Sequence, residues 1–166
     1  YYFSHARTAL KYGLQYLGFK PKDIILLPEY ICDSVLHPLE QLGLHHRYYS
    51  VSDELIPNWE SLKNLVDKRT KAIMMVHYFG QPQDIPTFQA FSDQHNLFLL
   101  EDNAHSHGGM LNGQLLGTYG DIGISSPRKI LNTLCGGVLW FKDEIIFSMP
   151  NLPAYKISLR YHMKNI

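Results

Sequence analysis

The sequence predicts an α/β fold built around a mostly parallel sheet. Short apolar runs typical of buried strands alternate with amphipathic segments of about ten residues typical of helices. The 166 residues are enough for one domain with a real core, and a hydrophobic content of 45% with 18% charged residues fits a globular chain. No repeat, low-complexity tract or linker interrupts the alternation.

The first two helices are predicted from spacing and end signals. A helix is expected over 6–17, because apolar residues recur there at helical intervals and Gly18 closes the pattern. A second helix is expected over 34–42, where Asp33 or Ser34 can cap its start. Apolar spacing predicts two further helices, at 57–66 and 85–95.

The strands are predicted from short apolar runs between these helices. They are expected at 24–27, 46–51, 72–76 and 97–100. From Gly108 onward, glycines divide the chain into short segments, including a glycine-flanked apolar run at 120–124 and another at 138–141. This pattern of glycines and short segments predicts turns and short strands that cover the edge of an active site.

An acidic pair marks the expected ligand edge of the sheet. Glu101 and Asp102 follow the apolar run 97–100, and open α/β sheets bind ligands at the carboxyl ends of their strands. A buried carboxylate needs a partner because its desolvation is costly. The partner of Asp102 is either a protonated ring nitrogen of a cofactor or an ordinary helix end or ion pair.

His105 and His107 form a His-x-His pair next to these acids. In an extended segment both side chains would point the same way and, with Glu101 or Asp102, could ligate a metal. Histidines with ordinary structural partners are the commoner case.

Lys129 is the second candidate for chemistry. A loop lysine is ordinarily solvated, but a lysine desolvated in a cleft can lose its proton and form a Schiff base. It lies between the run 120–124 and the Gly136-Gly137 pair. Ser126 could add a hydroxyl to a phosphate site, and Arg128 is interpreted as a surface charge rather than an anion clamp.

A phosphate could also bind at the start of the first helix. The segment 4–9 offers free backbone N–H groups and the Thr8 hydroxyl. An ordinary capped helix explains the same residues.

Several function classes are disfavoured. Fifteen Lys and Arg balance fifteen Asp and Glu, so no charge pattern for nucleic acid or an anionic membrane is present. No apolar run approaches the length of a membrane span. The sequence also lacks a dinucleotide fingerprint, a Walker loop and a nucleophile elbow. Two cysteines make no disulfide framework, which predicts a cytoplasmic protein.

Five motifs in order resemble one known family. They are Ala6-Arg7-Thr8-Ala9-Leu10, Leu27-Pro28-Glu29-Tyr30, the segment 70–82, Glu101-Asp102-Asn103-Ala104-His105, and the segment 120–137 with Ser126-Pro127-Arg128-Lys129. From His5 to about Lys142 the chain resembles the DegT-type sugar aminotransferases, pyridoxal 5'-phosphate enzymes of fold type I. The resemblance implies a three-layer α/β/α sandwich, the large cofactor-binding domain of that fold, over 1–150. Residues 151–166 would begin the connection to a small C-terminal domain that these 166 residues do not contain.

The resemblance also implies catalytic roles. Lys129 would hold the cofactor as a Schiff base and move protons, Asp102 would pair with the pyridinium nitrogen, and His105 would bond the phenolic oxygen. Family members with histidine in place of the lysine catalyse dehydration, so the lysine favours transamination.

Other residues are implied to hold the cofactor. Thr8, the Ala9 backbone N–H and Ser126 would bind the phosphate. Cys32 stands where an aromatic residue usually stacks on the ring, and Tyr30 is the expected substitute.

The implied function is transfer of an amino group from an amino acid, glutamate by expectation, to a nucleotide-linked keto sugar in a homodimer. The alternatives are a non-catalytic or altered fold type I relative and, less favoured, a metal-dependent hydrolase using His105 and His107.

Overall fold

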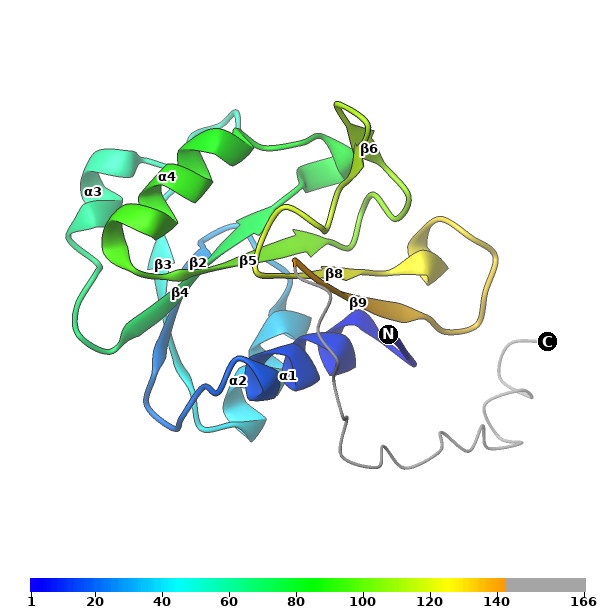
Figure 1. The fold of residues 1–166 in the computed structure, drawn as a ribbon, viewed down its shortest axis with the longest axis horizontal. Helices are drawn as coiled ribbons and strands as arrows, with labels where there is room; N and C mark the ends of the chain where they lie inside the picture. The colour runs from blue at the N-terminus through cyan, green and yellow to red at the C-terminus, as the bar shows by residue number, and fades with distance from the viewer. Residues whose placement is uncertain (143–166) are drawn as a thin grey trace.

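The computed structural model describes residues 1–142 (Figure 1). The helices are α1 (Ala6–Tyr16), α2 (Leu36–Gln41), α3 (Trp59–Lys63) and α4 (Ile85–His95). The strands are β1 (Tyr2–Phe3), β2 (Ile24–Pro28), β3 (His45–Tyr49), β4 (Thr70–Val76), β5 (Phe98–Asn103), β6 (Met110–Leu111), β7 (Gln114–Leu115), β8 (Ile122–Ser125) and β9 (Gly137–Phe141). Short 3₁₀ turns occur at Asp33–Val35, Tyr78–Gly80 and Pro127–Lys129.

One sheet organises the chain. Its seven strands lie in the order β1-β9-β8-β5-β4-β2-β3. The pairs among β2, β3, β4, β5 and β8 are all parallel, whereas β9 is antiparallel to both β8 and β1. The predicted mostly parallel α/β sheet is therefore confirmed.

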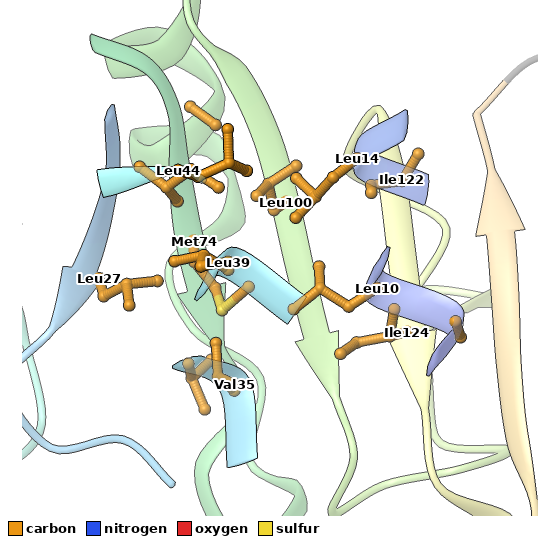
Figure 2. Close-up of a cluster of buried hydrophobic side chains, with 14 of the residues drawn as sticks. Leu10, Leu14, Leu27, Val35, Leu39, Leu44, Met74, Leu100, Ile122 and Ile124 are labelled. Carbon is orange, nitrogen blue, oxygen red and sulfur yellow. The ribbon is translucent and has the colours of Figure 1, made fainter. Parts of the chain in front are cut away.

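Helices cover both faces of the sheet, as Figure 1 shows, with α1 and α2 on one side and α3 and α4 on the other. Leu10 and Leu14 of α1 and Leu39 of α2 pack in one core with sheet residues such as Met74 (Figure 2). Phe88 and other α4 residues build a separate core against the opposite face. Successive side chains on a strand point to opposite faces, so each central strand contributes to both cores. The result is the expected three-layer sandwich.

The structure moves several predicted boundaries. β5 runs to Asn103, so Glu101 and Asp102 lie inside the strand rather than after it. The reason is that pairing with β4 and β8 continues along these residues and buries them from both sides. α3 begins at Trp59 rather than at 57, because Asn58 caps it by accepting a hydrogen bond from the Ser61 amide, and it ends at Lys63 rather than at 66.

The glycine-rich segment after Gly108 also differs from the prediction. β8 and β9 join the main sheet, and β6 and β7 form a separate two-stranded hairpin. The predicted domain boundary at 150 and the segment 151–166 lie outside the described residues. Within residues 1–142, no helix has the length and apolar character needed to cross a membrane.

Candidate active site

A cleft of about 280 Å³ opens at the carboxyl ends of the central strands. The first turn of α1 forms one wall, and the loop after β2 and the turn after β8 form others. The lining includes His5, Ala6, Arg7, Tyr30, Cys32, His77, Tyr78, Asp102, His105, Ser126, Arg128 and Lys129. Parallel sheets place ligands at this edge, so the location agrees with the prediction.

Asp102 and Lys129 line this one cleft although 27 positions separate them in sequence. Asp102 is 7% exposed, and its Oδ1 accepts a hydrogen bond of 2.9 Å from the Ala104 amide. Among residues 1–142 no other donor reaches this carboxylate. Burial raises its pKa, while the Ala104 bond and the charge of Lys129 act in the opposite direction. The carboxylate is therefore able to accept a further donor from a ligand.

Glu101 has the opposite surroundings. It is 1% exposed, and four donors fill its two oxygens. These are His77 Nε2 at 2.7 Å and the Gly117 amide on Oε1, and the Tyr119 and Gly120 amides at 2.7 and 3.0 Å on Oε2. His77 Nδ1 accepts from the Gln83 amide at 3.1 Å, so its proton is on Nε2, facing Glu101. Glu101 thus fastens the loop 117–120 to the sheet and has no free oxygen for a metal.

The His-x-His pair does not form one site. His105 lines the cleft, and its Nδ1 accepts from the Phe79 amide at 3.3 Å. His107 Nδ1 instead pairs with the Ser125 hydroxyl at 2.9 Å. The segment turns rather than extends here, so the predicted common direction of the two side chains is wrong. Within residues 1–142 no group of three His, Cys, Asp or Glu side chains could hold a metal ion, and the metal-hydrolase alternative loses its support.

Lys129 is exposed at the edge of the cleft rather than desolvated as predicted, and its charge acts on other groups of the cleft. It lowers the pKa of His105, where burial is the larger cause, and it contributes to lowering the pKa of Cys32. Ser126, 3% exposed, lies in the same wall, and its carbonyl accepts the Lys129 amide at 3.0 Å. Arg128 is exposed, in agreement with its interpretation as a surface charge, and it also borders the cleft. Burial is the main cause that lowers the pKa of His5, and the charges of Arg7 and Arg128 lower it further.

The start of α1 offers different atoms from those predicted. The Thr8 and Ala9 amides both donate to the His5 carbonyl, at 3.0 and 3.1 Å, because the helix begins at Ala6 with His5 as its cap. The Thr8 side chain lines a separate hollow beside Lys11. Ala6 and Arg7 line the cleft, and no hydrogen bond from the Arg7 amide is found in residues 1–142. An anion at this helix end would therefore meet Arg7 rather than Thr8 or Ala9.

Tyr30 and Cys32 both border the cleft. Tyr30 is 55% exposed, its carbonyl accepts the Tyr78 hydroxyl at 2.8 Å, and the two rings lie 5.7 Å apart. Hydrogen bonding with Ser34 lowers the pKa of Cys32. The predicted stacking candidate is thus held at the cleft by Tyr78.

His77 and Tyr78 shape the site, although the sequence predicts no role for them. His77 is fully buried next to β5, with its amide bonded to the Asp102 carbonyl at 3.0 Å. Tyr78 holds the Tyr30 loop. A histidine and an acid at the ends of adjacent parallel strands form a pattern that could have indicated the His77–Glu101 pair.

Known proteins resemble the chain along most of its described length. The sequence model of the DegT/DnrJ/EryC1/StrS aminotransferase family matches residues 3–153. A GDP-perosamine synthase of Vibrio cholerae is 30% identical over 146 residues, which cover 86% of this chain and 40% of that protein. The chain thus spans about 40% of the length of this curated relative.

Solved structures agree in fold. An aminotransferase from Psychrobacter cryohalolentis has a TM-score of 0.76 at 27% identity, covering 86% of this chain and 37% of that one. A GDP-4-keto-6-deoxymannose-3-dehydratase with a trapped PLP-glutamate geminal diamine has a TM-score of 0.75 at 30% identity, covering 86% of this chain and 39% of that one.

Proposed function

We propose a function from one premise: the chain belongs to the DegT/DnrJ/EryC1/StrS aminotransferase family. The described residues form the fold type I large domain. The proposed function is pyridoxal 5'-phosphate-dependent transfer of an amino group from an amino acid to a nucleotide-linked keto sugar. The observation that carries it is the meeting of Asp102 and Lys129 in one cleft.

The cleft fits the cofactor. Asp102 has accepting capacity left beside its single Ala104 bond, and a protonated pyridine nitrogen is a donor that matches it. The Arg7 amide and the Ser126 hydroxyl suit the phosphate at the opposite end. Arg7 and Arg128 add positive charge near that end.

Each residue of the chain has a proposed task. When bound, the cofactor supplies an aldehyde carbon that amines can join and a ring that accepts electrons from the substrate. Asp102 keeps the ring nitrogen protonated, and neutral His105 donates a hydrogen bond to the phenolic oxygen. Lys129 would anchor the cofactor and, as a free amine, would hold and move a proton at the reacting carbon of the substrate. Tyr30 is the proposed contact for the open ring face.

Relatives of this chain include both amino-sugar synthases and dehydratases by name. Lys129 favours transamination, because the family resemblance links dehydration to members with histidine in place of this lysine. Glutamate is the proposed donor, and the structure with a PLP-glutamate adduct supports it. A nucleotide-linked acceptor is supported by the GDP-sugar relatives.

We also propose a cytoplasmic homodimer. Bulky apolar side chains near the cleft are half or more exposed, among them Tyr30 at 55% and Leu131 at 51%. Exposed apolar groups of this kind mark contact surfaces. Cys32 and Cys135 are free thiols, which suits a reducing compartment.

The test is covalent trapping. The protein is mixed with pyridoxal 5'-phosphate, reduced with borohydride, digested and analysed by mass spectrometry. The expected result is one adduct, on Lys129, which Lys129→Arg abolishes and the control Lys142→Arg leaves intact. Labelling spread over several lysines, or none in a folded protein, would overturn the proposal.

A further inference from the structure

The turn Tyr78–Gly80 at the mouth of the cleft is strained. Phe79 has φ of 53° and Gly80 has φ of 83°, so two consecutive residues are left-handed. For a bulky residue this conformation is rare and costly. The Phe79 side chain is 69% exposed, so its own burial does little to offset that cost. Strain of this kind at the edge of a cleft indicates a local function.

The turn is built against His105. The Phe79 amide donates to His105 Nδ1 at 3.3 Å, and the two rings stack with centroids 5.9 Å apart and planes 16° apart. Gly80 approaches the same segment: a Cβ there would lie 3.4 Å from Ser106 Oγ and 3.5 Å from the His105 carbonyl oxygen. One turn therefore contacts both the ring and the backbone of His105.

These contacts fix the chemistry of the imidazole. A neutral histidine has one donor and one acceptor nitrogen, and the hydrogen bond at one nitrogen decides the state of the other. Because a backbone N–H reaches Nδ1, that nitrogen must be the acceptor and the proton must be on Nε2. The Phe79 ring lies nearly parallel to the imidazole, and a rotation of the imidazole that moved Nδ1 away would lose the hydrogen bond from the Phe79 amide.

We infer that Phe79 is a positioning residue that locks His105 as an Nε2–H donor directed into the cleft. The inference rests on the proposed function only for the acceptor of that bond, the phenolic oxygen of the cofactor. The pKa of His105 is lowered, mainly by partial burial and also by the charge of Lys129, whereas the charge of Asp102 acts in the opposite direction.

The lock is measured in cofactor-free protein by NMR. In ¹⁵N-labelled protein a scalar coupling across the hydrogen bond should join the Phe79 amide nitrogen to His105 Nδ1. It should vanish on acidification, because protonated Nδ1 cannot accept. Absence of the coupling while His105 is neutral, or a proton found on Nδ1, would overturn the inference whatever the variants do.

A pair of proline variants tests whether the Phe79 amide contributes to the lowered pKa of His105. Phe79→Pro removes the amide and forbids a positive φ. Asn96→Pro does the same at the end of α4, where Asn96 has φ of 56° and its amide donates to Asp93 O at 3.3 Å. Phe79→Pro should raise the His105 pKa toward its ordinary value, because the neutral form loses a donor, whereas Asn96→Pro should not. An unchanged His105 pKa in folded Phe79→Pro would contradict the lock.

Glutamine provides the rescue. Its side chain has an oxygen to accept from Phe79 and an NH₂ group to donate into the cleft. His105→Gln should bind pyridoxal 5'-phosphate within about threefold of wild type, and His105→Leu about tenfold more weakly. Equal weakening in both variants would count against the lock. If the protein binds the cofactor but shows no NMR coupling, only this inference is contradicted. If it shows the coupling but does not bind the cofactor, only the proposed function is contradicted.

Discussion

Glu101 and Asp102 are consecutive residues of β5, both carboxylates and both buried, yet the structure gives them opposite surroundings. Glu101 is held by four donors and fastens the loop 117–120 to the sheet. Asp102 has one donor and lines the cleft. The pleat of the strand separates them: Leu99 belongs to the core on the α4 side and Leu100 to the core on the α1 side, and the two acids continue this alternation.

Both acids are buried, so burial does not distinguish their roles. The number of hydrogen-bond donors on the carboxylate oxygens does distinguish them. A carboxylate with all its lone pairs occupied stabilises the fold. A carboxylate left with spare acceptors in a low-dielectric cleft costs stability and is available to a ligand. Substitutions at the two positions should therefore act with opposite sign on folding.

The largest effect is expected for Glu101→Gln. An amide NH₂ would replace one oxygen and face backbone donors, so the free energy of unfolding should fall by about 3 kcal/mol. Urea denaturation measures it, with Glu60→Gln as the matched control, because Glu60 is an exposed partner of Lys63. Equal midpoints for Glu101→Gln and wild type would remove the structural role of Glu101.

His77→Leu should cost somewhat less, about 2 kcal/mol, because it leaves the Gln83 amide without its acceptor and takes one donor from Glu101. Denaturation of the single variants and the double variant with Glu101→Gln forms a thermodynamic cycle. If the losses in free energy of unfolding of the two single variants add up to that of the double variant, His77 and Glu101 do not act as a pair.

Asp102→Asn should act in the other direction. The amide oxygen can keep the Ala104 bond while the buried charge disappears, so cofactor-free protein should gain about 1 kcal/mol of stability. The same variant should bind pyridoxal 5'-phosphate at least about tenfold more weakly, because a neutral amide cannot pair with a protonated ring nitrogen. Thermal melting and a cofactor titration measure both effects, and a less stable Asp102→Asn protein would contradict the contrast.

The smallest expected effect is on pH dependence. Burial raises the pKa of Asp102 above that of an unfolded aspartate, about 3.9. The folded state then holds this proton to higher pH, so wild type should lose stability relative to Asp102→Asn as pH rises from about 4 through the raised pKa. Above that pKa the difference should stay constant. A difference that shrinks with rising pH would show that the pKa is lowered instead.

Most of the helices and strands of the fold could be predicted from the sequence. The spacing of apolar residues predicts the four helices and the strands β2 to β5, because each of these elements buries a face that its spacing displays. It does not predict the two-residue strand β1. The boundaries of α3 and β5 were less accurate, since a cap at Asn58 and sheet pairing along Asp102 depend on tertiary contacts. The sequence predicts only short strands at an active-site edge for this region, because the glycines interrupt the apolar pattern, whereas β8 and β9 are strands of the main sheet.

The site could be predicted in part. Order and spacing of motifs indicated Asp102, His105 and Lys129, and the structure places all three in one cleft. The same motifs did not say which first-turn amides of α1 are already bonded, which depends on where the helix begins. Three of the four partners of Glu101 are backbone amides in a loop sixteen to nineteen residues away, and no local pattern encodes them.

The most direct test of the central contrast is the protonation of the cofactor ring. Pyridoxal 5'-phosphate labelled with ¹⁵N in its ring is bound to wild type and to Asp102→Asn, and the nitrogen resonance is recorded near neutral pH. A protonated nitrogen is expected in wild type and an unprotonated one in Asp102→Asn. An unprotonated nitrogen in wild type would contradict the assignment of Asp102 as the cofactor's partner.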